Sequence, residues 1–417
     1  MQRAWLPMEV KRVADTRHFD VAIIGAGIAG ASLALALSGE GLSIALVEAQ
    51  SLAVPKLPAT FGVHNFDPRV SALTPRSRAF LEKLGAWEAI TAYRYCPYRH
   101  MTVWDAEGTG QIEFDRAEVN APELGHIVEN RAIVSALLAR VSVAADINLL
   151  SPVALQSCAR LESSRMLLEL DEGGVLEVDL LVAADGALSR VREMMAFHSR
   201  EWDYGHRAIV ATVEVADSHE ETAWQRFLPT GPLALLPLPG EEGHHYCSVV
   251  WSLQEHLVDD VLALEDQAFC TELERACEGR LGTVLESSRR VAFPLRQRHA
   301  VDYVQEAVAL VADAAHTIHP LAGQGINLGL QDVAVLAQEV IAGHHRGVSP
   351  GQLQLLRRYQ RRRKGENLMM MSAMDGFKRL FEQQSLPLRW LRNAGMRTVD
   401  QLQPVKQQLM RHAMGLG

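Results

Sequence analysis

Several common signatures are missing from this sequence, and each absence argues against a class of protein. No stretch of about 18 consecutive apolar residues occurs, so we predict no membrane-spanning helix. The formal net charge is −9, which argues against nucleic acid as a partner, because phosphate binding requires a basic surface. The five cysteines are scattered without a C-x-x-C pair, which gives no support to a zinc site and favours a reducing cytoplasm.

The N-terminus also lacks the apolar core of a signal peptide. We expect residues 1–18 to form a disordered leader in which Met8 is an alternative start. At 417 residues, the chain is long enough to bury a large core and to form two or three lobes.

A dinucleotide-binding pattern follows this leader. Residues 19–24 are typical of a buried strand, and residues 31–41 predict a helix that ends at Gly39 or Gly41. A second apolar run ends in Glu48, where a carboxylate can accept hydrogen bonds from a ribose diol and would repel a 2′-phosphate. The pattern therefore predicts FAD or NAD rather than NADP at this loop.

Three glycines separate the first strand from its helix. We predict that Gly25 makes the tight turn, Gly27 lets the backbone approach a pyrophosphate, and Gly30 lets the helix pack closely on the strand. The free N–H groups at the start of the helix would then face the anion.

Two arginines in the middle of the chain are candidates for neutralising cofactor phosphates. Arg69 precedes a helix that we expect to start near Thr74 and Pro75. Arg131 lies near the start of a helix predicted over residues 126–141, and its alternative role is that of a solvated helix residue.

Two later segments place an acid and glycines just ahead of a helix. Asp185 and Gly186 follow a buried strand, where they either adjoin a dinucleotide or form an ordinary turn with a capping aspartate. Residues 311–332 combine Asp313 and Pro320 with a glycine pair before a helical run. The pairing of this segment with the N-terminal loop indicates one long cofactor gripped from both ends of the chain.

The pattern along the chain predicts an α/β fold with an inserted sheet. Short apolar runs separated by turn residues indicate a mixed or antiparallel sheet over residues 196–289, which would form the wall of a substrate pocket. The expected regions are a cofactor domain over 19–195 and 290–345, with an excursion to the substrate lobe near 95–125, and a helical region over 346–417. The basic C-terminal tail would lie on an anionic membrane or a partner protein, or cap the cofactor lobe, and we favour the cap.

These segments resemble the three fingerprints of the group A flavoprotein aromatic hydroxylases. The narrower resemblance is to the FAD-dependent hydroxylases of ubiquinone biosynthesis, and it extends over roughly residues 19–416. It rests on RVSAL (69–73), LGAW (84–87), GHIVEN (125–130), DAAHTIHPLAGQGINLG (313–329) and PLRWLRNAG (387–395).

The resemblance implies a Rossmann-like FAD domain with an inserted substrate sheet, as in para-hydroxybenzoate hydroxylase. It implies that NAD(P)H reduces FAD transiently and that the reduced flavin and O₂ form a C4a-hydroperoxide that attacks a polyprenylated phenol. Asp313 would hold the ribityl chain, and Pro320 would lie near the reacting face. The backbone of the Gly323–Asn327 loop, with Gly325 and Ile326, would face the flavin pyrimidine ring.

The ring position and several partners stay open at this point. GTGQIEF (108–114) and EWDYGHRAIV (201–210) are most similar to the branch acting on C5, the 2-polyprenylphenol 6-hydroxylases. CPYR (96–99) and the run from Thr222 to Pro232 are similar to a paralogue acting elsewhere on the ring, at C6 or C1. The chain is also compatible with a non-catalytic flavin-binding scaffold, a homo-oligomer, a biosynthetic complex and peripheral contact with the inner face of the membrane.

The chain departs from the family pattern at two positions. Ala312 stands where the family has glycine, and Leu188 stands where it has asparagine. If position 312 requires a positive φ, alanine costs about 1 kcal/mol there. The spacing of His316 and His319 is compatible with a metal site, but no further ligand lies nearby, so we predict packed or surface histidines and no metal. No phenol-activating base is identified, and Tyr204 and His206 are weak candidates.

Overall fold

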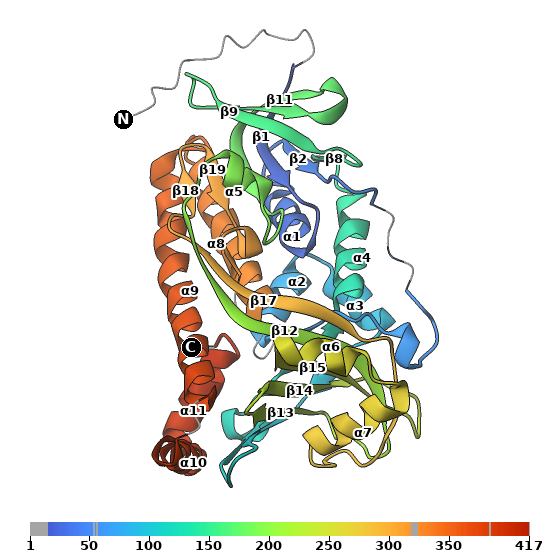
Figure 1. Cartoon of the computed structure of the whole chain (residues 1–417). Helices are drawn as coiled ribbons and strands as arrows, with labels where there is room; N and C mark the ends of the chain where they lie inside the picture. Colours follow the sequence, from blue (N-terminus) through green and yellow to red (C-terminus); the bar gives the residue numbers. More distant parts are fainter. Residues whose placement is uncertain (1–15, 53–54, 56, 318–323, 383–384, 417) are drawn as a thin grey trace.

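A largely parallel sheet forms the centre of the upper lobe in the computed structural model, which describes residues 16–52, 55, 57–317, 324–382 and 385–416 (Figure 1). The main strand order is β18-β19-β11-β1-β2-β8, and β9 and β10 extend antiparallel from β11. Its central strands are buried on both faces, as expected for parallel strands that are covered by other elements. The strands are β1 (Thr16–Ile24), β2 (Ile44–Val47), β8 (Ile147–Leu150), β9 (Leu155–Arg160), β10 (Met166–Leu170), β11 (Val175–Ala183), β18 (Val304–Gln305) and β19 (Val308–Leu310).

Helices and a small sheet pack around this parallel sheet. Helix α1 contacts both α4 and α8, and Thr74 caps α2 with Pro75 in its first turn, as predicted. The helices are α1 (Ile28–Leu37), α2 (Pro75–Lys83), α3 (Trp87–Tyr93), α4 (Asn130–Val141), α5 (Arg190–Met194) and α8 (Gln324–His344). The small sheet has the order β3-β7-β4, from β3 (Val70–Leu73), β7 (Gly125–Glu129) and β4 (Cys96–Tyr98).

The second lobe is built on a nine-stranded, mostly antiparallel sheet. Its main order is β20-β17-β12-β15-β14-β13-β5-β6, with β16 paired to β12. The long strands β12 and β17 run from one lobe to the other, side by side (Figure 1). The elements are β5 (His100–Asp105), β6 (Gln111–Asp115), β12 (Ser199–Val215), β13 (Thr222–Leu228), β14 (Gly231–Leu238), β15 (His245–Gln254), α6 (Glu255–Leu262), α7 (Asp266–Ala276), β16 (Val284–Ser287), β17 (Val291–Ala300) and β20 (His316–Thr317).

Three boundaries and two helices differ from the sequence prediction. Strand β1 begins at Thr16, because residues 16–18 pair with β11 instead of belonging to a leader. Strand β7 occupies residues 125–129, so the helix expected from residue 126 begins at Asn130. Strand β17 pairs with β12 over most of its length and therefore extends the inserted sheet rather than the cofactor lobe. Helices α6 and α7 were not predicted, and they cover one face of that sheet.

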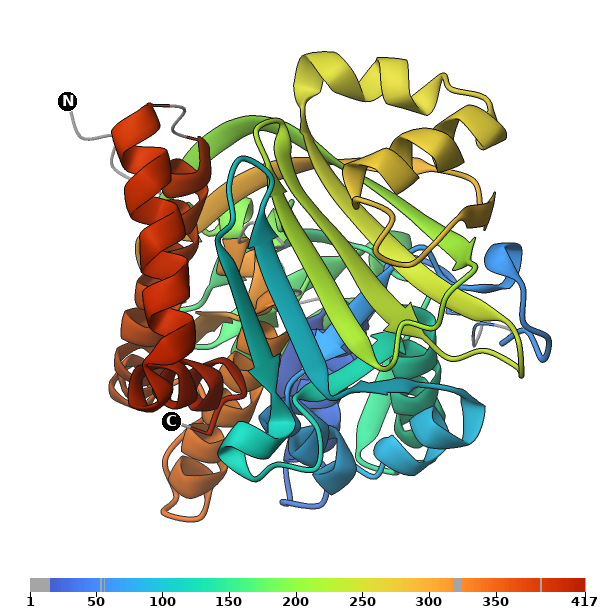
Figure 2. The same cartoon turned by 90° about the horizontal axis from the view of Figure 1, so that it is seen from below.

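Three helices complete the chain: α9 (Leu353–Glu382), α10 (Leu386–Gln401) and α11 (Gln403–Ala413). Helix α9 runs beside α8, whereas α10 lies along β6 and α11 contacts the 3-10 turn Arg116–Val119 (Figure 2). The expectation that the tail caps the cofactor lobe is therefore wrong for α10, which packs on the edge of the inserted sheet. Helix α11 also packs there, but its C-terminal end reaches Arg76 of α2 in the cofactor lobe. Within the described residues, no helix combines the length and the apolar character needed to cross a membrane.

A buried carboxylate ties α8 to α9 and to the segment that precedes α8. Asp332 is fully buried, and its Oδ1 accepts hydrogen bonds from Arg363 Nε at 2.8 Å and Asn367 Nδ2 at 3.1 Å. Its Oδ2 lies 2.5 Å from His316 Nε2 and accepts the Ala312 N–H at 3.2 Å. Burial alone raises the pKa of Asp332, but His316 and Arg363 outweigh this effect, so the pKa lies below its ordinary value.

We expect Asp332→Asn to lower the free energy of unfolding by about 3–5 kcal/mol, because Arg363 would lose its buried counter-charge and keep only the half-exposed Glu366. Urea unfolding measures the change. The matched control is Asp259→Asn, which breaks the exposed pair with Arg207 and should cost less than about 1 kcal/mol.

The pH dependence of the same variant gives a second readout. The Asp332 contribution is fully present above the unfolded carboxyl pKa of about 3.9 and is lost as the pH falls through the lower folded value. The difference in stability between wild type and Asp332→Asn should therefore persist at neutral pH and shrink only below about pH 4. A difference that vanishes near neutrality would contradict this assignment.

Candidate functional site

A cavity of about 530 Å³ lies where β1 and β11 end and where α1 and α8 begin. Its lining comes from five distant parts of the sequence: the glycine loop, the Arg69 region, the start of α4 (Asn130 and Val134), the Ala184–Gly186 turn, and the residues on both sides of the start of α8 (Ala312, Asp313 and Thr317, and residues within Gly325–Leu330). The structure thus brings together the segments that the sequence pattern assigned to one cofactor.

The three glycines of the N-terminal loop have different physical roles. Gly25 has a φ of +100°, and a Cβ there would lie 2.5 Å from the Ala184 carbonyl oxygen. A Cβ on Gly30 would lie 1.8 Å from the Gly25 carbonyl oxygen, so α1 packs on the loop only because this position is glycine. A Cβ on Gly27 would meet no heavy atom within 4 Å, so this residue leaves open space in the cavity. These contacts fit the tight turn predicted at Gly25 and the close packing predicted at Gly30, whereas the approach of a pyrophosphate to Gly27 stays a prediction.

Glu48 supports the glycine loop from the end of β2. Its Oε2 accepts the Ala26 N–H at 2.9 Å, and its Oε1 accepts the Gln50 N–H at 2.9 Å. The carboxylate therefore lies beside the loop, where its contact with a ribose stays a prediction.

The Asp185–Gly186 turn both caps helix α5 and contributes to the cavity wall. Asp185 Oδ2 accepts the Arg190 and Val191 N–H groups, at 2.8 and 3.2 Å, and thereby caps α5. Its Oδ1 is buried with no hydrogen-bond partner among the described residues. Gly186 has a φ of +81° and lines the cavity with open space beside it. One carboxylate oxygen thus has the capping role, and the other is left available.

Ala312 has the left-handed backbone conformation in which alanine is strained. Its φ is +52°, a value that alanine adopts at a cost of about 1 kcal/mol. Asp313 follows it and lines the cavity. The surrounding protein raises the pKa of Asp313 by desolvation, while His316 and Arg69 oppose that shift.

The predicted arginines have different surroundings. Arg69 lines the cavity, and its guanidinium lies 4.8 Å from the centre of the Phe293 ring. Arg131 is not among the residues that line the cavity. Its guanidinium pairs with Glu129 at 2.5 Å and also donates to the Asn65 carbonyl. The structure therefore does not bring Arg131 together with the other predicted phosphate contacts.

The start of α8 contributes two of its predicted residues to the cavity. Gly325 and Ile326 line it, whereas Asn327 is buried and turns its side chain to a neighbouring segment. Its Oδ1 accepts the Thr74 N–H at 3.0 Å, and its Nδ2 donates to the Ala72 carbonyl at 2.8 Å. The sequence pattern did not predict this clamp. Pro320, Gly323 and His319 lie outside the described residues.

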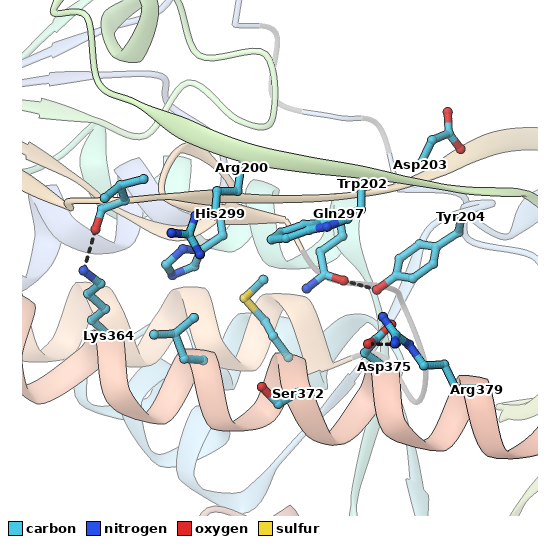
Figure 3. Close-up of a pocket in the computed structure, with 13 residues that line it drawn as sticks. Arg200, Trp202, Asp203, Tyr204, Gln297, His299, Lys364, Ser372, Asp375 and Arg379 are labelled. Atoms are coloured by element: carbon cyan, nitrogen blue, oxygen red, sulfur yellow. Dashed lines mark hydrogen bonds and ion pairs between the residues drawn. The ribbon is translucent and has the colours of Figure 1, made fainter.

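A second cavity, of about 550 Å³, lies between the β12–β17 pair and α9 (Figure 3). Trp202, Tyr204 and Gln297 line one side, and Tyr204 Oη donates a hydrogen bond to Gln297 Oε1. Lys364, Leu368, Met371, Ser372, Asp375 and Arg379 of α9 line the other side. The sequence pattern did not identify this α9 wall, although its residues recur at helical spacing.

The two cavities lie on either side of one short strand pair. His299 of β17 lines the second cavity and pairs with His316 of β20, and the next residue, Thr317, lines the first. Desolvation, together with nearby His316, Lys364 and Arg200, lowers the pKa of His299 to about 4. This histidine is therefore neutral at physiological pH.

Three other expectations about side chains have clear outcomes. The Leu/Pro-rich run over residues 233–238, which suggested an apolar wall of the substrate pocket, forms β14. Its leucines are packed into hydrophobic cores and line neither of these two cavities. His206 is buried, with Nδ1 2.7 Å from the Tyr204 carbonyl oxygen, and does not line them either. His316 is a packed histidine, as predicted.

Comparison with known proteins identifies relatives over nearly the whole chain. A family model described as "FAD binding domain" matches residues 18–371. The chain is 35% identical over 398 residues to the 3-demethoxyubiquinol 3-hydroxylase of Escherichia coli, covering 95% of this chain and 98% of the relative. It is 31% identical over 444 residues to the human mitochondrial ubiquinone biosynthesis monooxygenase COQ6, covering 95% of this chain and 92% of the relative.

Solved structures confirm the predicted fold. PqsL, a probable FAD-dependent monooxygenase from Pseudomonas aeruginosa, superposes with a TM-score of 0.74 at 22% identity, covering 92% of this chain and all of that one. The p-nitrophenol 4-monooxygenase PnpA from Pseudomonas putida also gives a TM-score of 0.74, at 18% identity, covering 96% and 98%.

Gly27→Ala should separate cofactor binding from folding. The backbone at Gly27, with φ −69° and ψ −170°, accepts alanine, so the free energy of unfolding should change by less than about 0.5 kcal/mol. The added methyl group would occupy the space that a pyrophosphate needs, so we expect the bound flavin per protein to fall at least about tenfold. Gly30→Ala is the contrasting variant, because it should destabilise the fold itself. Unchanged flavin content in Gly27→Ala would contradict this placement.

Ala312→Gly should stabilise the protein by about 1 kcal/mol, because glycine adopts a positive φ without strain. Thermal unfolding measures the effect. Ala139→Gly, at an exposed position within α4, is the matched control and should destabilise the protein by about 0.5–1 kcal/mol. Equal effects of the two substitutions would contradict the strain at position 312.

Proposed function

Since this chain belongs to the FAD-binding family of ubiquinone hydroxylases, we propose that it hydroxylates the aromatic ring of a polyprenylated phenol, using FAD, O₂ and NAD(P)H. The observation that carries the proposal is the first cavity, in which Gly27, Gly186 and Asp313 meet although they are distant in sequence. A cavity with contacts from both ends of the chain fits one long cofactor better than a nicotinamide held at the N-terminal loop alone.

The residues present fit the phosphate end of FAD. Gly27 and Gly186 leave open space, and the start of α1 has no side-chain cap, so its backbone N–H groups can receive an anion. Arg69 would neutralise part of the phosphate charge. Glu48 and the unpartnered Oδ1 of Asp185 would accept hydrogen bonds from hydroxyl groups of the cofactor.

The opposite end of the cavity fits the flavin ring system. Asp313 would accept hydrogen bonds from the ribityl hydroxyls, and the backbone at Gly325–Asn327 would donate toward the pyrimidine ring at the positive end of α8. Pro320 would lie at the reacting face. Bound FAD supplies the redox and oxygen chemistry, so the chain needs only to bind, orient and exclude water.

The second cavity would receive the phenol ring. It lies across the β17–β20 pair from the first cavity, and it combines aromatic, apolar and polar walls that suit an amphipathic ring. The Tyr204–Gln297 pair would orient the ring hydroxyl, although neither side chain is a strong base at neutral pH. The reductant would dock transiently, because no second glycine loop of the G-x-G-x-x-G type occurs in the sequence.

For the ring position, we propose C5, on the resemblance of residues 108–114 and 201–210 to the 2-polyprenylphenol 6-hydroxylases. One observation favours another ring carbon: the chain is 35% identical over nearly the full length of the Escherichia coli 3-demethoxyubiquinol 3-hydroxylase. Expression in bacterial strains that each lack one ring hydroxylase tests the choice. Mass analysis should show that the intermediate which lacks the C5 oxygen is consumed, and rescue of a different strain would overturn C5.

Ser372→Trp should reduce phenol hydroxylation without loss of flavin. Ser372 is exposed within the second cavity, so a bulky side chain there fills the space proposed for the ring. We expect kcat/KM for a short-chain prenylphenol to fall at least about tenfold, with flavin content and melting temperature unchanged.

Ala373→Trp is the matched control, because the neighbouring residue is exposed on α9 but does not line the cavity. It should retain the wild-type kcat/KM. Equal losses of kcat/KM in both variants would show that the phenol ring does not bind in this cavity. A wild-type protein that binds flavin but oxygenates no phenol would instead establish the scaffold function.

A further inference from the structure

Helix α10 buries Arg392 and Asn393 beside Met396, whereas several of its large apolar residues face outward. Arg392 is 3% exposed and forms a bidentate pair with Asp105, with Nε and Nη2 2.7 and 2.9 Å from the two carboxylate oxygens. Asn393 is also buried and bonds to Asp105 and to the Gly110 N–H. On the outside, Trp390 is 70% exposed and Leu391 is 57% exposed. Aqueous solvent favours the opposite arrangement.

Helix α11 likewise buries a cation, beside Met410, and exposes large apolar residues. Lys406 is only 4% exposed, and its Nζ pairs with Glu118 at 2.9 Å and Asp400 at 3.1 Å. Val405 and Leu409 lie one turn apart and are about half exposed, and Leu416 continues the same helical stripe beyond the helix end. Each of the two helices thus buries one cation against the inserted sheet and leaves large apolar residues exposed.

Exposed apolar residues of the two helices form a group that we call the outer face. It consists of Leu386, Trp390, Leu391, Leu402, Val405 and Leu409, all exposed. Figure 2 shows α10 and α11 at the flank of the molecule, beside the β5–β6 hairpin. Scattered exposed leucines are ordinary, but a concentrated group on helices with buried charges indicates a face that meets an apolar medium.

Within residues 385–417, the exposed charged side chains are cationic. Arg397 and Arg411 are exposed, and the single acid of residues 385–417, Asp400, is paired with Lys406. The chain as a whole carries a net charge of −9, so this segment differs in sign from the rest of the molecule. Exposed guanidinium groups beside leucines and a tryptophan complement the headgroups and acyl boundary of an anionic bilayer.

We propose that the outer face of α10 and α11 docks on the surface of an anionic phospholipid bilayer. The choice of a bilayer rests in part on the proposed function, because a polyprenylated phenol partitions into membranes. The second cavity supports the same choice, since its α9 wall extends from Lys364 to Arg379 and α10 begins seven residues later, at Leu386. Docking would bring the cavity wall close to the lipid that holds the substrate.

Vesicle sedimentation of the full-length, flavin-loaded protein tests the proposal. We expect the protein to sediment with vesicles of phosphatidylcholine and phosphatidylglycerol, more weakly with phosphatidylcholine alone, and with a blue shift of tryptophan emission that Trp390→Phe reduces. Leu391→Glu combined with Leu409→Glu should weaken partitioning at least about tenfold. Both positions are exposed, so flavin content and melting temperature should not change.

Val143→Glu is the matched control, because Val143 is 71% exposed in the upper lobe, away from the outer face. It should bind vesicles as the wild type does. Failure of the wild type to bind, or equal binding by the double variant, would overturn the proposal. Light scattering without lipid gives a further test. If the wild type is a dimer and the double variant is a monomer, a second copy of the chain covers the outer face, and the proposal is overturned. Vesicle binding without phenol oxygenation would refute the proposed function and leave docking intact.

Discussion

The buried carboxylate of Asp332 is the contact on which both cavities depend. It is bonded to the segment before α8 through Ala312 and His316, and to α9 through Arg363 and Asn367. The segment carries the walls of the first cavity, and α9 carries a wall of the second. One carboxylate therefore sets the spacing between the place proposed for the flavin and the place proposed for the ring. Burying an ion pair costs desolvation free energy. The role of this pair is therefore to fix one arrangement of α8, α9 and the segment before α8.

The β12–β17 pair gives the two lobes a shared wall. These strands cross from the parallel sheet of the upper lobe to the antiparallel sheet below, and their pairing shifts register between Asp203 and His206. Tyr204 lies at this irregularity, where an interrupted ladder can aim a side chain at a cavity. The Asn327 clamp holds the start of α8 against β3 and α2 in a similar way. Rigid strands and helices thus position both sites, which suits chemistry that depends on orientation.

Local sequence patterns predicted most segments that line the first cavity, but they did not predict the α9 wall of the second cavity. The glycine loop, the Asp185–Gly186 turn and the strain at Ala312 follow from steric rules that act within a few residues. Arg131 does not line the first cavity, and a carboxylate only two residues away, Glu129, pairs with it. The pairing of Asp332 with Arg363 and the α9 wall depend on how two long helices lie together. The spacing of residues 364–379 is equally compatible with a core face and a solvent face, so sequence alone cannot identify a cavity wall there.

The close approach of Ala312 to Gly329 means that a substitution tolerated at one position depends on the residue at the other. A Cβ on Gly329 would lie 2.8 Å from the Ala312 Cβ, so a side chain at 329 is incompatible with alanine at 312. In a relative with glycine at 312 that obstacle is absent, and position 329 is freer to vary. The alanine in this chain therefore makes the two positions interdependent: a side chain at position 329 requires that Ala312 is first replaced by glycine.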